Sequence, residues 1–218
     1  YLIKSSSSAT VYYVENQKKR PLTAWSDVQK INSNSTIITL PNFIVDGLSD
    51  GSLVLNQGGL VKTATNGTVY FVDGLNTLIP LTNFGYATEA GIPLRVSIAP
   101  DATVSSYTKS GSTLGTLFQC GGTKYISIAG KLNKLSSSQD TAMGLTHQSL
   151  LLCPPSSVVD LPGNFFLDST GTIYQITGGQ KNPIGSWSKY LILGGNSSNT
   201  VRVSNFVTGQ IPTGSVLN

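Results

Sequence analysis

The sequence predicts an all-β fold made of four repeats of about 50 residues each. Only 11% of the 218 residues are charged, against about 25% in an average soluble domain, which argues against a helical surface of Glu–Lys pairs. The 23 glycines and ten prolines supply the backbone conformations of turns, and frequent turns mean short strands. A Thr-x-Tyr motif recurs four times along the chain. Composition and recurrence together therefore indicate short strands in repeated units.

Each repeat is expected to contain a β-hairpin whose first strand carries the Thr-x-Tyr motif. The motif lies at residues 10–12, 68–70, 123–125 and 172–174. Turn residues follow each copy, among them Asp73-Gly74 and Gly178-Gly179, and then a second short strand. Alternation along a strand places the tyrosine and the threonine of each motif on one face. We expect the repeated tyrosines to be core residues.

A second motif ends the hairpin, in which a proline is followed four residues later by an aromatic side chain. Proline closes the strand because it has no N–H for the ladder. The third repeat departs from this pattern at residues 134–138, which contain neither proline nor an aromatic residue. The aromatic residues of the other three repeats are Trp25, Phe84 and Trp187.

After the second motif we expect one or two helical turns, a β-rich segment, and a glycine turn into a closing strand. The last residues, 213–217, resemble that closing strand, while residues 1–4 resemble the strand that elsewhere follows it. If the terminal strand pairs beside the first, four repeats close into a β-propeller-like array without exposed sheet edges. An open array of hairpin units is the alternative. Residues 1–218 are expected to form a single repeat domain, with repeats at about 1–52, 53–112, 113–163 and 164–218.

The candidate ligand-binding residues are Trp25, Phe84, Trp187 and Tyr13. The simplest expectation for the three aromatic residues after the proline is that they fill gaps between neighbouring repeats. Aromatic residues that recur around an array are also what sugar-binding surfaces use, because a flat apolar ring stacks on a pyranose face. The two interpretations stay open.

The sequence offers little for catalysis, metal or cofactor chemistry. There is one histidine, His147, and we expect it to be structural or exposed, because no motif surrounds a catalytic partner for it. Two cysteines and one histidine fall short of a zinc site, so we expect no metal and no cofactor. Two of the ten carboxylates could form a glycosidase pair, which keeps a polysaccharide-active hydrolase as an alternative.

Charge and hydropathy limit the partners. The net charge of +4 is dispersed apart from Lys18, Lys19 and Arg20, so we expect no nucleic-acid partner. No apolar run is long enough to span a bilayer, so we expect no membrane insertion. The chain begins at Tyr1 without a basic start and an apolar run, so we expect that it carries no signal peptide and is a fragment or a mature piece.

Cys120 and Cys153 lie 33 residues apart and are expected to form one disulfide, which would indicate an oxidising compartment; two free buried thiols are the alternative. A low charge with much Ser, Thr, Gly and Asn favours the disulfide, because that style is common in exported β proteins.

The first repeat resembles repeats of secreted and cell-surface bacterial proteins. Those repeats contain an apolar-apolar-Lys strand, a Val-Tyr-Tyr-Val strand and a Lys-Arg-Pro-Leu step, which here correspond to residues 2–4, 11–14 and 19–22. The resemblance is clear in repeats one and two, partial in four and weak in three. It implies an extracellular or cell-surface attachment role and supplies no catalytic residues.

The sequence therefore predicts a non-catalytic binding or attachment module. Its expected ligand is a cell-envelope or extracellular polysaccharide, held through several weak sites whose combined engagement raises avidity. A structural spacer or protein-interaction scaffold is the third hypothesis.

Overall fold

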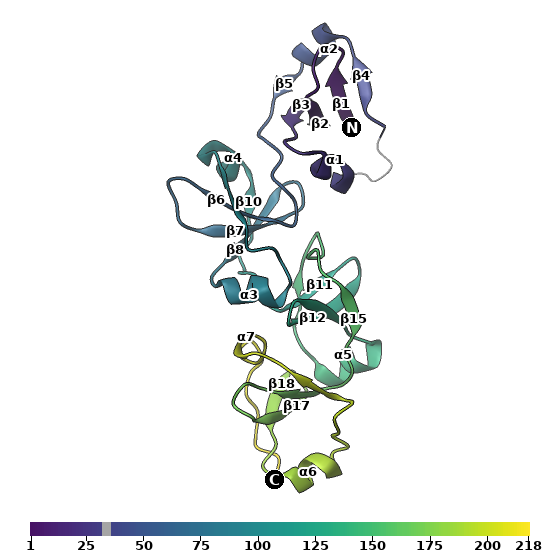
Figure 1. The fold of residues 1–218 in the computed structure, drawn as a ribbon, viewed down its shortest axis with the longest axis vertical. Helices are drawn as coiled ribbons and strands as arrows, with labels where there is room; N and C mark the ends of the chain where they lie inside the picture. Colours follow the sequence, from purple (N-terminus) through teal and green to yellow (C-terminus); the bar gives the residue numbers. More distant parts are fainter. Residues whose placement is uncertain (32–35) are drawn as a thin grey trace. The chain divides into compact units, whose positions relative to one another are not determined.

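The computed structural model describes residues 1–31 and 36–218, which form four small β-sheets with short helices (Figure 1). The chain divides into two compact units. Unit 1 comprises residues 1–80 and 95–111, and unit 2 comprises residues 81–94 and 112–218. The four sheets define repeats one to four, and each sheet lies within one of the four segments expected from the sequence.

The first repeat shows the topology that the others follow. Three antiparallel strands form its centre, and two further strands add in parallel at the two edges, giving the order β4-β1-β2-β3-β5. Its strands are β1 (Leu2–Ser5), β2 (Val11–Glu15), β3 (Lys18–Pro21), β4 (Ile38–Leu40) and β5 (Ser49–Asp50), and its helices are α1 (Trp25–Ile31) and α2 (Asn42–Asp46).

The second repeat has the same strand order, β10-β8-β7-β6-β9, with β9 parallel to β6 and β10 parallel to β8. Its strands are β6 (Leu60–Thr63), β7 (Val69–Asp73), β8 (Thr77–Leu81), β9 (Val96–Ala99) and β10 (Thr108–Lys109), and its helices are α3 (Phe84–Glu89) and α4 (Asp101–Ser106). Helix α3 belongs to unit 2, where the Tyr86 ring meets Phe206 edge-on at 5.3 Å between centroids.

The third repeat keeps the sheet and loses the second helix. Its order is β14-β11-β12-β13-β15. Its strands are β11 (Leu117–Cys120), β12 (Thr123–Ile128), β13 (Lys131–Lys134), β14 (Gln148–Ser149) and β15 (Val158–Asp160), and its helix is α5 (Ser137–Met143). Helix α5 begins with a capping box between Ser136 and Gln139, so this sequence starts a helix without the proline-aromatic motif.

The fourth repeat has the order β18-β17-β16-β19. Its strands are β16 (Phe165–Leu167), β17 (Ile173–Thr177), β18 (Gln180–Pro183) and β19 (Thr200–Arg202), and its helices are α6 (Trp187–Ile192) and α7 (Asn205–Thr208). The C-terminal segment takes the fifth position, because Thr213 and Leu217 bridge to Lys181 and Ile184 of the same repeat.

The predicted pairing of the terminal strand with the first strand is therefore wrong. Strand β1 has β2 along one edge and β4 along the other, and the C-terminal segment completes its own sheet. The physical reason is the crossover connection: a segment that follows a helix returns in parallel to the hairpin it came from, which a short connection favours. The chain is mostly β with few helices, as predicted.

The repeated tyrosine has a structural role in three repeats. Each tyrosine ring faces the ammonium group of a lysine. The same ammonium group donates to carbonyl oxygens at the end of the second helix of that repeat, where a positive charge is favourable. The pairs are Lys19 with Tyr12 at 6.0 Å, Lys109 with Tyr70 at 5.9 Å and Lys181 with Tyr174 at 5.6 Å from nitrogen to ring centroid. In the third repeat, which lacks that helix, Tyr125 packs on Phe118 instead.

A second link joins the first strand of each repeat to the segment after its fourth strand. In three repeats a hydroxyl in the turn after the first strand donates to the first residue of the second helix. These hydrogen bonds are Ser6 to Asn42 at 3.2 Å, Thr65 to Asp101 at 2.6 Å and Ser169 to Asn205 at 3.1 Å. In the third repeat the Cys120–Cys153 disulfide joins the corresponding places, so the predicted disulfide is confirmed.

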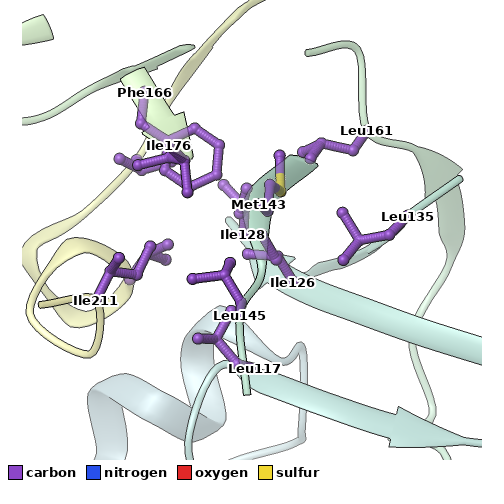
Figure 2. Packing of buried hydrophobic residues seen from close by; sticks show 12 residues of the cluster. Leu117, Ile126, Ile128, Leu135, Met143, Leu145, Leu161, Phe166, Ile176 and Ile211 are labelled. Carbon is purple, nitrogen blue, oxygen red and sulfur yellow. The ribbon is translucent and has the colours of Figure 1, made fainter. Parts of the chain in front are cut away.

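An apolar core of unit 2 is shared by the third and fourth repeats. Figure 2 shows Leu117 and Ile126 of one sheet turned toward the same interior as Phe166 and Ile176 of the other, with Met143 between them. Ile126, Met143, Phe166 and Ile176 are fully buried. The two repeats are therefore one packed body rather than two independent hairpins.

Candidate functional site

A polar cavity of about 530 Å³ lies in unit 2 beside the short strand β14. Its lining combines hydroxyl, amide and imidazole side chains with one leucine. The lining residues are Ser112, Thr113, Gly115, Leu117, Thr146, His147, Gln148, Ser149 and Gln210. Mixed polar lining of this kind suits a small polar ligand.

The sheet and the disulfide together hold one wall of this cavity in place. Strand β14 pairs in parallel with β11, where Gln148 lies opposite Phe118 and Ser149 opposite Gln119. The next residue continues the pairing, since the Leu150 N–H donates to the Gln119 carbonyl at 2.8 Å. Cys153 then anchors the segment to the end of β11.

His147 lines the cavity and carries a buried hydrogen-bond acceptor. Its Nδ1 lies 3.0 Å from the Leu145 carbonyl oxygen, and because a carbonyl can only accept, Nδ1 carries the proton. Nε2 is then the acceptor of a neutral ring; it is buried and has no hydrogen-bond partner in the described part of the chain. Burial lowers the pKa of His147 below its ordinary value of 6.5, which favours this neutral form.

Gln148 presents a second acceptor. Its Nε2 donates to the Ser112 hydroxyl at 2.8 Å, which fixes the orientation of the amide. Its Oε1 is buried and, like Nε2 of His147, finds no donor among the described residues. Two buried acceptors without donors are an uncommon arrangement, because most buried polar atoms are paired.

Gln210 also lines the cavity and is oriented by the segment that leads into β11. Its Oε1 accepts from both the backbone N–H and the hydroxyl of Thr116, at 2.6 and 2.7 Å. Hydrogen bonds therefore hold both β14 and Gln210 in place, so the site is largely preformed.

The arrangement lacks the pairing that nucleophilic catalysis requires. In the described chain no serine or threonine hydroxyl donates to Nε2 of His147, and the Nδ1 proton is held by a backbone carbonyl rather than by a carboxylate. No Asp or Glu is among the residues that line this cavity. The described geometry of this cavity offers two unpaired acceptor atoms and no activated nucleophile.

The structure places the predicted aromatic residues on the surface. Each is the first residue of the helix after the hairpin, and the exposed fraction is 62% for Trp25, 44% for Phe84 and 65% for Trp187. The expectation that they fill gaps between repeats is therefore wrong. The reason is local: the proline ends the strand, the chain turns to start a helix, and the first helical position projects outward.

Tyr13 lies apart from the other candidates. It is half-buried in the middle of β2, opposite Leu2 on one side and Arg20 on the other. Burial and the nearby Glu15 carboxylate raise the pKa of its phenol. None of the four candidates is among the residues that line the cavity beside β14.

Trp25 lines a small hollow of unit 1. The hollow measures about 190 Å³ and is formed by residues 9–11, 22–25 and Val28. At the other end of the chain, Trp187 packs against Tyr190 with 4.8 Å between ring centroids.

The basic trio belongs to the structure of unit 1. Arg20 is buried and donates to Ser52 and Leu75 carbonyls and to the Tyr107 hydroxyl, at 3.0 to 3.1 Å. A polar groove of about 480 Å³ beside it contains Glu15 and Asp50, but Glu15 lies 3.6 Å from Arg20 and Asp50 lies 3.3 Å from Lys19. These contacts account for both carboxylates as ion-pair partners; the hydrolase alternative stays a prediction.

Residues 1–31 and 36–218 contain neither a cluster of metal ligands nor a helix able to cross a membrane. No group of three or more His, Cys, Asp or Glu side chains there is arranged to hold a metal ion. Within the same residues, no helix combines the length and the apolar character needed to cross a bilayer.

His147, Gln148 and Gln210 are the residues that sequence reasoning missed. The single histidine was the one available signal, and nothing in its neighbours indicates an orphaned acceptor. That property arises because β14 packs beside β11 and places two consecutive side chains against one cavity.

The chain matches no protein-family model and no curated protein. It is similar to a chain of the periplasmic assembly from the ESX-5 inner membrane complex, with 10% identity over 100% of this chain and 92% of that one, at a TM-score of 0.26. It is also similar to a chain of an intact ESX-5 inner membrane complex, with 9% identity over 99% and 79% of the two chains, at a TM-score of 0.25. A third similarity is to the EccB3 dimer from the ESX-3 core complex, with 9% identity over 100% and 98%, at a TM-score of 0.26. Scores this low do not establish a shared fold.

Proposed function

We propose that the protein is a non-catalytic binding module of an exported or cell-surface protein, and that its unit 2 cavity binds a neutral polyhydroxylated ligand such as a saccharide of the cell envelope. The observation that carries the proposal is the pair of buried acceptors, Nε2 of His147 and Oε1 of Gln148. A saccharide hydroxyl is a donor, and one donated hydrogen bond to each atom removes the cost of burying it unpaired, about 1–3 kcal/mol per atom.

Charge also favours a neutral ligand. The cavity lining contains no Lys, Arg, Asp or Glu, and burial keeps His147 uncharged at neutral pH. An anionic or cationic ligand would lose its hydration there without a compensating charge. The disulfide supports the location, because structural disulfides persist in oxidising compartments.

The exposed aromatic residues supply the second part of the proposal. Trp25, Phe84 and Trp187 take the same position in three repeats, and each presents a ring on which a sugar face can stack. In this proposal a polymer engages the cavity and one or more rings together, so that weak contacts add through effective concentration. A closed, propeller-like array of the four repeats is not required, since the cavity lies within unit 2.

The experiment is a titration of the intact protein with soluble fragments of envelope polysaccharides. Calorimetry measures the affinity, and the NMR chemical shifts of the His147 imidazole report whether the ring is contacted. His147→Phe keeps a flat ring and removes the acceptor, and Gln148→Met keeps the length and removes the amide. Trp187→Ala tests the contribution of an exposed ring, and Ile98→Ala is the matched control, because it shortens an exposed apolar side chain that does not line the cavity. We expect the first two variants to lose binding at least tenfold and to leave the unfolding midpoint close to that of the wild type.

Three outcomes would count against the proposal. The cavity is not the site if binding is unchanged in His147→Phe and Gln148→Met but lost in Trp187→Ala. The scaffold hypothesis gains if no saccharide binds. Hydrolysis of any fragment, abolished by changing one carboxylate, would favour the enzyme.

A further inference from the structure

Consecutive repeats in unit 2 are joined by a backbone contact between a hairpin turn and a helix end. The turn between β12 and β13 lies on the end of α3, where the Gly130 N–H donates to the Glu89 carbonyl at 3.0 Å. The Ala129 N–H donates to the Glu89 carboxylate at 2.7 Å. A glycine with positive φ, Gly91, follows the helix, and a Cβ there would lie 2.5 Å from the Gly130 oxygen.

The same contact recurs between the third and fourth repeats. The turn between β17 and β18 lies on the end of α5, where the Gly178 N–H donates to the Ala142 carbonyl at 3.0 Å and the Gly179 N–H donates to the Met143 carbonyl. Gly144 follows the helix with φ +60°, and a Cβ there would lie 3.2 Å from the Gly179 nitrogen. In both cases the end of the helix that follows a hairpin holds the turn of the next repeat.

Helix α6 has the same kind of end with no turn on it. It is followed by Gly194 with φ +82°, the position of Gly91 and Gly144 in the other repeats, and a Cβ there would meet no described atom within 4 Å. Ile192 takes the position of Glu89. Its exposed fraction is 78%, whereas that of Glu89 is 8%.

The first repeat offers a turn of the matching kind. Its hairpin between β2 and β3 turns through Asn16 and Gln17, with φ +49° and +62°, close to the +59° and +76° of Gly178 and Gly179. Asn16, Gln17 and the following Lys18 are exposed. A lysine beside the turn also suits a helix end, because unpaired carbonyls give that end a partial negative charge.

We propose that the end of α6 binds the first-repeat hairpin turn of a second copy of this chain. The contact uses different surfaces on the two partners, so it is heterologous and joins copies head to tail into chains or closed rings. Such chains would align many copies of the unit 2 cavity, but the contact itself does not depend on any ligand.

Sedimentation of the intact protein over a range of concentrations tests the contact. Ile192→Glu supplies the carboxylate that Glu89 uses for a turn N–H, so we expect it to tighten association about fivefold, the effect of one charge-assisted hydrogen bond. Ile192→Lys places a second positive charge against Lys18 and is expected to weaken association by a similar factor. Ile98→Lys is the control, at an apolar position of unit 1 that is 66% exposed.

Cross-linking identifies the partner surface. A variant with cysteines at positions 17 and 192 is expected to form disulfide-linked chains between molecules, with the 17–192 bond found by mass spectrometry. A 17–192 bond within one molecule would show that the occupant is the same chain and would overturn the second copy. The proposal also fails if a 192–192 bond dominates, if the wild type is monomeric at the highest concentration it reaches, or if Ile192→Lys associates as the wild type does.

Discussion

Removal of the Cys120–Cys153 disulfide is expected to destabilise unit 2 by about 3.7 kcal/mol. The two cysteines are 33 residues apart, and the chain-entropy relation for a loop of that length gives about 12.5 cal/mol/K, which is about 3.7 kcal/mol at 25 °C. The replacement Cys120→Ala with Cys153→Ala keeps two small apolar side chains, so the lost cross-link accounts for most of the change. The loss is large beside the 5–15 kcal/mol that stabilises a typical domain.

Urea unfolding followed by tryptophan fluorescence measures this change. With a slope of about 2 kcal/mol/M, the unfolding midpoint of the unit should fall by about 2 M urea. Reduction of the wild-type protein should produce the same shift, which separates the effect of the bond from that of the substitutions. A shift below about 0.5 M in both experiments would refute the view that this bond constrains the unfolded chain.

The local consequence is equally testable. Strand β14 pairs with β11 through two residues, so the bond holds a segment that the sheet alone secures weakly. In the double-alanine variant we expect the Leu150 N–H, which bonds to Gln119, to exchange with solvent much faster than in the wild type. Unchanged protection of that amide would show that β14 is held by packing rather than by the bond.

Three further outcomes are expected. Gly85→Ala should destabilise unit 2 by about 2 kcal/mol in thermal unfolding, because the added Cβ would lie 2.2 Å from the Phe206 ring, whereas the same change at Gly67, which has no described neighbour within 4 Å, should be nearly neutral. The free energy of unfolding of the wild type should decline as pH falls below 6.5, and that of His147→Phe should decline less. The reason is that burial lowers the folded-state pKa of His147, so the unfolded chain binds the proton at higher pH than the folded chain does. Asp27 is buried with one carboxylate oxygen unpaired, and burial raises its pKa above the ordinary 3.8. The stability that the protonated carboxyl contributes is therefore lost as pH rises through the folded-state pKa. Asp27→Asn should remove this pH dependence and should be about 1 kcal/mol more stable than the wild type at pH 7.

The repeated hairpins could be predicted because their signals are local. A two-residue turn needs residues that tolerate positive φ, a half-buried strand shows alternating apolar residues, and a proline ends the hydrogen bonding of a strand. All three signals lie within about ten residues of one another in the sequence. The disulfide was predictable because two cysteines leave one pairing. The parallel edge strands were not, because β5 and β14 are two residues long and carry no pattern of their own.

The candidate site depends on tertiary placement, and the sequence therefore could not show it. His147 and Gln148 become orphaned acceptors only because β14 lies beside β11 and Ser112 takes the amide nitrogen. The aromatic residues were misplaced for a related reason. Spacing after the proline predicts their recurrence, but whether the first residue of a helix projects inward or outward depends on the direction in which the chain turns.

The disulfide of the third repeat and the hydroxyl links of the other repeats join equivalent positions of the sheet. Because of this equivalence, the third repeat does not need the second helix that the other repeats need. A hydroxyl link requires a helix whose first residue presents an oxygen, so residues 41–46, 100–106 and 204–208 must stay helical for their repeats to remain closed. A covalent bond has no such requirement. The third repeat therefore closes without a second helix, provided that Cys153 stays in reach of Cys120.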